Sequence, residues 1–181
     1  MLYDNQEILD YLLHNRGKLI HLYGEADTGR TSVMFSMIDH LAANGKICAY
    51  LVPSESKIQE ERFRRYIKDP SLCPLVVVKD RKSLSSSLSL LSRVAEDIFI
   101  DNFLSYVLYR TRRQNASMMS MLSGYAYGTY ANLILCNDTR HIPGEEKTSP
   151  AYMEIFRRYS SKNILVQKDD KQDVHYAFKE W

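Results

Sequence analysis

Short unbroken apolar runs alternate along this chain with longer segments that mix apolar and polar residues. Runs bounded by glycine, proline or polar residues are typical of buried strands. The runs that predict strands are 19–23, 46–52, 74–79, 97–101 and 132–138. The segments 75–78, 97–100 and 132–136 are apolar without alternation, and we expect them to be parallel strands covered on both faces.

The segments between these runs carry apolar residues at helical spacing. In 30–45, for example, Val33, Met37 and Leu41 recur every four residues, and Gly45 ends the pattern. The segments that predict helices are 30–45, 54–69 with Ser54 as N-cap, 83–96, and most of 102–130.

The last part of the chain has a different pattern. The runs 162–168 and 173–181 are joined by the polar residues "DDKQ", which predicts a β-hairpin. A polar loop is expected over 139–150. Strands alternating with helices, followed by a hairpin, predict an α/β fold whose sheet is parallel in its centre with an antiparallel edge. We expect one domain over residues 1–181.

The stretch "YGEADTGRTSVMF" (23–35) links a predicted strand to a predicted helix and matches a phosphate-binding loop. The pattern G-x-x-x-x-G-K-[ST] is met at Gly24, Gly29 and Thr31, but Arg30 stands at the lysine position. Such a loop wraps phosphates with backbone N–H groups at a helix N-terminus, and the hydroxyl after the lysine holds magnesium. The candidate nucleotide-binding residues are Gly24, Asp27, Gly29, Arg30, Thr31 and Ser32.

Two of these residues weaken the prediction of nucleotide binding. The planar fork of Arg30 replaces a compact ammonium group. Asp27 places a negative charge beside the expected phosphates, and we expect a residue other than glycine there to resist a left-handed backbone turn. Three interpretations follow: a strand-to-helix turn without a ligand, weak ATP binding, or competent hydrolysis.

Composition and charge exclude several other classes. The chain is 45% hydrophobic and 25% charged, as in soluble globular proteins, and no apolar run approaches the ~20 residues of a membrane helix. Its net charge of +2 does not by itself indicate a nucleic-acid binder. Cys48, Cys73 and Cys136 form no C-x-x-C pair and no metal site is expected; Cys48 and Cys136 are predicted core residues. The expected location is cytoplasmic.

Several stretches, taken in order, resemble the core of the RecA/RadA recombinase family. The matching stretches are "LDYLL" (9–13), "YGEADTGRTS" (23–32), "AYLVPSESKIQEERFRRY" (49–66), "DIFIDNFLSYVLYR" (97–110), "RRQNASMMSMLSGYAYGTYANLILCND" (112–138) and "RRYSSKNILVQK" (157–168). The resemblance implies a RecA-like core related to a short archaeal RadA paralogue. It also implies that the family's N-terminal DNA-binding domain is missing, because only about 18 residues precede the first predicted strand.

The resemblance implies roles for three acidic residues. Asp101 corresponds to the aspartate that supports magnesium-bound water, although a residue at the end of a strand can equally cap the next turn. Glu55 corresponds to the glutamate that activates water only if one residue is inserted, since Ser54 takes that place otherwise. Asp138 stands where the family has a glutamine that senses the terminal phosphate, and an ionised acid cannot donate that hydrogen bond.

The implied function is that of an accessory factor in homologous recombination and DNA repair that has lost ATP hydrolysis, with no cofactor or with weakly bound ATP and magnesium. Its expected partners are a RadA-type recombinase and single-stranded DNA. The candidate DNA-binding residues in the two DNA-facing loops are Arg110, Arg112, Arg113, Arg140 and His141. The alternatives are solvated basic faces on a pure interaction module, or a slow P-loop ATPase or other nucleotide-dependent enzyme that uses the atypical loop 24–31.

Overall fold

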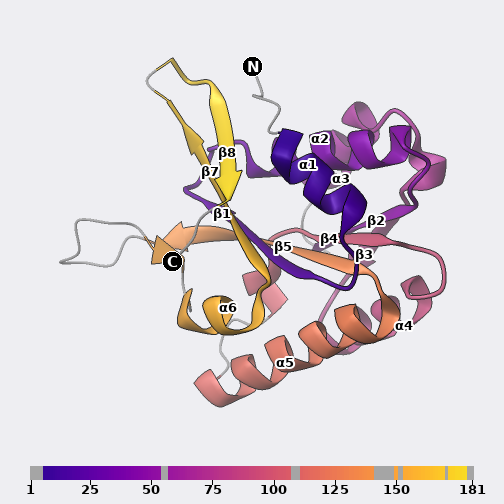
Figure 1. Cartoon of the computed structure of the whole chain (residues 1–181), viewed down its shortest axis with the longest axis vertical. Helices are drawn as coiled ribbons and strands as arrows, with labels where there is room; N and C mark the ends of the chain where they lie inside the picture. The colour runs from indigo at the N-terminus through magenta and orange to yellow at the C-terminus, as the bar shows by residue number, and fades with distance from the viewer. Residues whose placement is uncertain are drawn as a thin grey trace.

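Figure 1 shows the fold in a computed structural model of the chain. The structure describes residues 6–53, 57–106, 111–140, 149–150, 153–169 and 171–178.

The molecule is built on one twisted sheet with the strand order β3-β2-β4-β5-β1-β7-β8 (Figure 1). All neighbours in this order are parallel except β7 and β8, which form an antiparallel hairpin. A two-residue strand, β6, pairs antiparallel with the end of β5. The strands are β1 (Leu19–Gly24), β2 (Cys48–Pro53), β3 (Leu75–Val78), β4 (Asp97–Ile100), β5 (Asn132–Arg140), β6 (Ser149–Pro150), β7 (Lys162–Lys168) and β8 (Val174–Phe178). The predicted mostly parallel α/β sheet with a C-terminal hairpin is confirmed.

Helices cover both faces of this sheet. One face packs against α1, α2 and α3, and the other against α4, α5 and α6 (Figure 1). The helices are α1 (Gln6–His14), α2 (Arg30–Ala43), α3 (Lys57–Tyr66), α4 (Arg81–Leu91), α5 (Arg112–Thr129) and α6 (Met153–Tyr159), with short 3-10 turns at Pro70–Leu72 and Phe103–Tyr106. Alternate residues of each central strand enter the two cores, as the two-residue period of a strand requires. In β1, Leu19 and Tyr23 join one core, and Ile20 and Leu22 join the other.

Two helices were not predicted. In α1, Ile8, Leu9 and Leu12 are buried against the core on the α2 side, so the helical spacing was present in the sequence. In α6, Phe156 reaches the opposite core, but the helix has only seven residues and gives a weak periodic signal.

The predicted burial of 75–78 is wrong, whereas β4 and most of β5 are buried as expected. β3 lies at the edge of the sheet: Val78 is fully buried, but Leu75 and Val76 are only partly buried and Val77 is 43% exposed. An unbroken apolar run therefore indicates a strand but does not say whether the strand lies in the centre of the sheet.

Other boundaries shifted because side chains cap helices. α4 begins at Arg81, before the predicted start at 83, since the Asp80 carboxylate accepts a hydrogen bond from the Ser83 backbone N–H at 2.7 Å. The long predicted helix after β4 is confirmed only from Arg112, where Thr111 is the N-cap. Ser54, the predicted cap of the helix at 54–69, lies outside the described residues.

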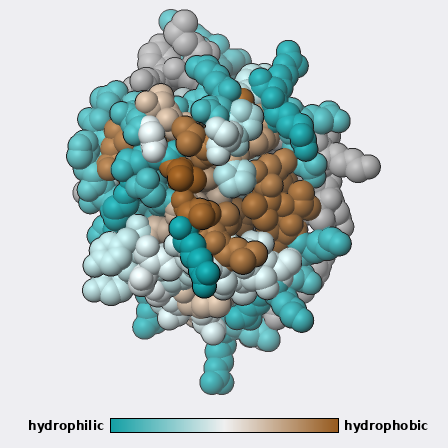
Figure 2. Space-filling model, turned by 90° about the vertical axis from the view of Figure 1, so that its right-hand side faces the viewer, coloured by the Kyte–Doolittle hydropathy of each residue, from teal (hydrophilic) through white to brown (hydrophobic). Residues whose placement is uncertain are grey.

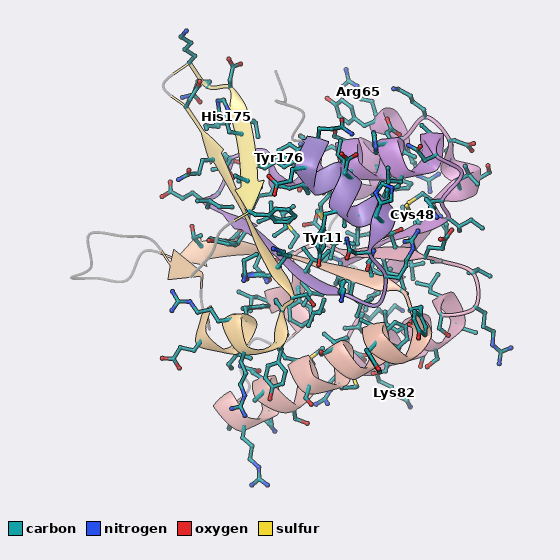
Figure 3. The ribbon with its side chains drawn as sticks, viewed as in Figure 1. Tyr11, Cys48, Arg65, Lys82, His175 and Tyr176 are labelled. Atoms are coloured by element: carbon teal, nitrogen blue, oxygen red, sulfur yellow. The ribbon has the colours of Figure 1, made fainter. Side chains whose placement is uncertain are left out.

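The C-terminal hairpin closes one side of the core that lies between the sheet and helices α1, α2 and α3. Tyr11 of α1 meets Phe178 of β8 edge to face, with 5.3 Å between ring centroids. Tyr176 of β8 is buried in the same core, and His175 lies nearer the hairpin tip (Figure 3). All three cysteines are free and buried, as expected for Cys48 and Cys136.

Candidate nucleotide-loop site

The loop between β1 and α2 is a compact turn. The Thr28 backbone N–H donates to the Glu25 carbonyl oxygen at 3.4 Å, and the Thr28 hydroxyl donates to the same oxygen at 2.8 Å. Glu25, Ala26 and Asp27 are exposed, and Thr28 is buried. The predicted strand–loop–helix arrangement is therefore present.

Both motif glycines are required at their positions, Gly24 by a close approach to the backbone of β7 and Gly29 by its left-handed backbone. A Cβ atom on Gly24 would lie 2.3 Å from the Val166 carbonyl oxygen of β7. Gly29 has φ 89°, and a Cβ atom there would lie 2.9 Å from Cγ2 of Val174 in β8. The loop therefore lies close against β7 and β8.

Asp27 corrects one expectation drawn from the sequence. Its φ is 60°, so the loop does take a left-handed turn at this position without glycine. Aspartate is one of the few residues other than glycine that tolerate this region, because its short side chain can bond locally. Asp27 therefore affects the site through its charge and leaves the backbone path intact.

The cation at the lysine position is already paired within the chain. The Arg30 guanidinium forms an ion pair with the Asp138 carboxylate. The Arg30 side chain is 14% exposed and that of Asp138 is 56% exposed. Asp138 stands beside the loop because Gly24 of β1 and Asp138 of β5 are partners in the parallel pairing of these strands.

Asp101 lies at the carboxyl end of β4 and receives three hydrogen bonds. Its Oδ2 accepts from the Tyr50 hydroxyl at 2.6 Å and from the Thr31 hydroxyl at 3.3 Å. Its Oδ1 accepts from the backbone N–H of Asn102 at 2.8 Å. Asp101 thus contacts Thr31 of the loop and also caps the turn that follows β4, as one of its two interpretations expects. Its implied role in supporting magnesium-bound water stays a prediction.

Tyr50 is a residue that sequence reasoning missed. It lies in the centre of β2, is fully buried, and stacks on Phe63 with 5.2 Å between ring centroids. Burial, with the neighbouring Asp101 carboxylate, raises the pKa of Tyr50 far above its ordinary value, so its hydroxyl stays a donor. No local motif marks it, because its role depends on strand order alone.

Ser32, the last candidate nucleotide-binding residue of the loop, accepts a hydrogen bond from a residue of α3. The Arg62 guanidinium donates to the Ser32 hydroxyl oxygen at 3.2 Å. A second arginine therefore stands near the start of α2, and the sequence did not place it there.

Only some of the other predicted site residues lie in the described part of the chain. Glu55, Arg110 and His141 lie outside it. Arg112 and Arg113 begin α5, where Arg113 is exposed, and Arg140 ends β5. The roles of these residues stay predictions.

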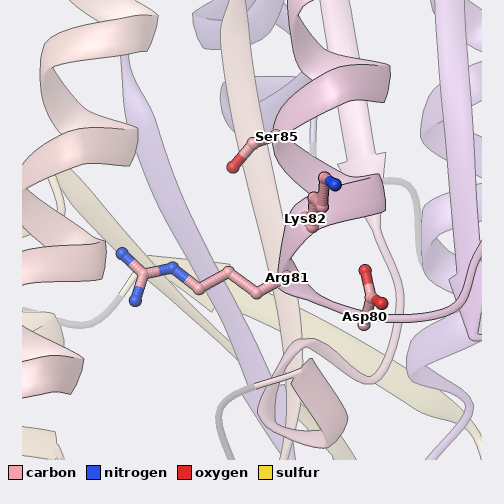
Figure 4. A pocket seen from close by; sticks show the side chains of 4 residues that line it. All are labelled: Asp80, Arg81, Lys82 and Ser85. Carbon is pink, nitrogen blue, oxygen red and sulfur yellow. The ribbon is translucent and has the colours of Figure 1, made fainter.

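A hollow elsewhere on the surface is separate from this loop. It is lined by Asp80, Arg81, Lys82 and Ser85 at the start of α4 (Figure 4). α4 follows β3, and three strands stand between β3 and β1 in the sheet. The hollow therefore plays no part in the site described here.

The described residues contain no group of three or more histidine, cysteine, aspartate or glutamate side chains placed to hold a metal ion. Within the same ranges, no helix combines the length and the apolar character needed to span a membrane.

Comparison with known proteins does not assign the chain to a family. No model of a known protein family matches the chain, and no curated protein matches it.

Proposed function

We propose that this chain is an accessory factor of homologous recombination related to RecA/RadA recombinases, which has lost ATP hydrolysis and acts by contact. The observation that carries this proposal is the ion pair between Arg30 and Asp138. The side chain that would attract the outer phosphates is already neutralised by a carboxylate of the same chain.

The state of Asp101 supports the loss of hydrolysis. Both of its oxygens accept hydrogen bonds, and the tyrosine donor is buried and stays protonated. A magnesium ion held by Thr31 would have to compete with Tyr50 for this carboxylate. The acidic loop residue Asp27 further disfavours a triphosphate because like charges repel.

An apolar surface supports a protein partner. Figure 2 shows a broad area of apolar side chains on the side of the molecule where β3 and α4 lie in Figure 1. Of the large apolar side chains near this edge, Val77 of β3 is 43% exposed, Leu90 of α4 is 74% exposed and Val94 is 54% exposed. Exposed apolar areas of this kind, beside an edge strand, are typical of protein interaction sites.

The geometry of β3 favours one mode of contact. No described strand pairs with its outer edge, so its backbone groups are available to an extended segment of a partner. We propose that a RadA-type recombinase contributes such a segment, with apolar side chains that pack on Val77 and Leu90.

The exposed face at the end of α3 supports a role for single-stranded DNA. Arg64, Arg65 and Lys68 are exposed there, and Tyr66 is 53% exposed. The Arg65 guanidinium lies 5.8 Å from the centroid of the Tyr66 ring. Basic side chains beside an aromatic platform suit phosphates and stacked bases of a single strand.

The decisive experiment is a titration of the purified chain with fluorescent ATP and magnesium, followed by single-stranded DNA at two salt concentrations. We expect no ATP binding in the micromolar range and no turnover, and DNA binding that falls steeply as salt rises. Micromolar ATP binding with measurable hydrolysis would refute the loss of catalysis. Absence of DNA binding at low salt would leave protein contact alone.

A slow P-loop ATPase is the second candidate, and one observation favours it. The Thr31 hydroxyl and the Asp101 carboxylate lie 3.3 Å apart, and both motif glycines are present, with the left-handed turn at Gly29. If this candidate is right, Thr31→Ala will abolish ATP binding and turnover that the unmodified chain displays.

A further inference from the structure

We propose that the Asp138 carboxylate is an internal substitute for a bound phosphate, so that the loop is a latent oxyanion site closed by the chain itself. This inference rests on the proposed function in one respect, namely that the loop descends from a phosphate-binding loop. It adds that the Asp138 carboxylate blocks the loop, that the excluded ligands are phosphates, and that Asp138 alone controls their binding.

Strand pairing fixes the place of this carboxylate. β1 and β5 are adjacent and parallel, and Asp138 is the register partner of Gly24, the last residue of β1. Arg30 is the first residue of α2, whose N-terminal N–H groups point toward the loop. The pair between Arg30 and Asp138 therefore spans the loop from the strand side to the helix side.

The two partners differ in solvent exposure. The Arg30 side chain is 14% exposed, and that of Asp138 is 56% exposed. Because water can solvate the Asp138 carboxylate, that side chain can leave Arg30 at small cost, as for other ion pairs close to the surface. The nearly buried Arg30 then keeps its place beside the α2 N-terminus and is free to meet an incoming anion.

The surrounding charges select the ligand. Asp27 and Asp138 repel anions, and so does the exposed Glu25 of the same loop. Arg30 attracts anions, as does Arg62, whose guanidinium donates to the Ser32 hydroxyl. When the carboxylate of Asp138 is made neutral, one repulsive charge is lost and Arg30 loses its internal partner. The site then favours phosphate oxygens, which a guanidinium binds in a bidentate manner.

The test compares Asp138→Asn with a control variant, Asp39→Asn. The control also removes one negative charge, but from α2. Asp39 also contacts a basic residue, with its carboxylate 3.7 Å from the Lys68 ammonium group. Binding of inorganic tripolyphosphate and of magnesium ATP is measured by calorimetry, and the melting temperature of each variant verifies folding. We expect at least tenfold tighter binding of tripolyphosphate in Asp138→Asn and less than twofold change in Asp39→Asn.

A double variant, Arg30→Ala with Asp138→Asn, tests whether the tighter binding of tripolyphosphate depends on Arg30. We expect the gain to disappear, because the guanidinium that Asp138 releases is absent. A gain that persists in the double variant, or no gain in Asp138→Asn, would overturn the inference. If tripolyphosphate and magnesium ATP gain equally, the site recognises phosphates alone; a larger gain for ATP adds contacts with the nucleoside, and either result supports the latent site.

The experiments distinguish a failure of the Asp138 inference from a failure of the proposed function. If the unmodified chain binds and hydrolyses ATP, the proposed function is wrong. If the unmodified chain does not bind ATP and Asp138→Asn gains nothing, only the internal substitute is wrong, and the loss of catalysis stands.

Discussion

His21 is fully buried in the middle of β1, where its ring stacks on Phe156 of α6 with 3.8 Å between centroids. Burial lowers the pKa of His21 from 6.5 to about 3, and the neighbouring Asn163 side chain opposes this shift. The ring is therefore neutral in the folded protein at physiological pH. The unfolded chain, by contrast, protonates this residue near its ordinary pKa.

This difference predicts a pH dependence of stability. Below pH 6.5 the unfolded state binds a proton at His21, whereas the folded state binds it only near pH 3. The free energy of unfolding therefore decreases as pH falls from 6.5 to about 3. The contribution of one such group reaches about 1.4 kcal/mol per pH unit. We expect His21→Phe, which keeps the stacking on Phe156, to show a shallower decline than the unmodified chain in urea unfolding between pH 6 and pH 4.

The comparison of slopes separates His21 from the carboxylates. All acidic residues titrate equally in both proteins, so only the difference between the two curves reports on His21. Parallel curves would show that the buried ring does not resist protonation.

At the scale of elements, a buried polar network joins the amino ends of β4 and β5 to the segment before β1. The Asp97 carboxylate is fully buried and receives hydrogen bonds from Arg16 at 2.7 Å and from the Asn132 amide at 2.8 Å. Burial raises the pKa of Asp97, while Asn132 and Arg16 act against that shift. Arg16 also contacts Glu96 at 2.8 Å, and Lys46 contacts the same carboxylate oxygen at 3.2 Å.

Two variants of this network are expected to lose very different amounts of unfolding free energy. Arg16→Ala leaves the Asp97 charge buried without its cation, which costs about 3–5 kcal/mol of unfolding free energy. Lys46→Ala removes an ion pair close to the surface and costs about 0–1 kcal/mol. Urea unfolding at pH 7 measures both values, and equal costs would show that burial does not distinguish the two pairs.

At the scale of the whole molecule, the two edges of the sheet differ. One edge is β3, beside exposed apolar side chains, and the other is β8 of the antiparallel hairpin. The hairpin also lies close to the loop at Val166 and Val174, so a partner there would approach the candidate site. The β3 edge lies away from this loop and is the edge that we propose for a partner.

A pair of substitutions tests this assignment. If the proposed RadA-type recombinase binds at β3, Val77→Lys is expected to weaken this association at least tenfold, because the apolar contact is lost and the ammonium group must be desolvated. Ala177→Lys makes the same kind of change at an exposed position of β8 and is expected to leave association unchanged. Surface plasmon resonance gives both affinities, and equal losses would remove β3 as the contact site.

The sequence by itself predicted most of the elements, because the period of apolar residues and the placement of glycines are local properties. It predicted the β1–loop–α2 unit, the β7–β8 hairpin and the mostly parallel sheet. It missed α1 and α6 and did not tell a central strand from an edge strand at 75–78, since burial depends on which strands become neighbours.

The tertiary structure alone decided the state of the candidate site. Strand order brought Tyr50 of β2 to Asp101 after β4, and the pairing of β1 with β5 set Asp138 beside Gly24. Each pair is far apart in sequence, so no motif contains both partners. Local periodicity determines where strands and helices form, whereas the partners of Arg30 and Asp101 follow from the order in which the strands pack.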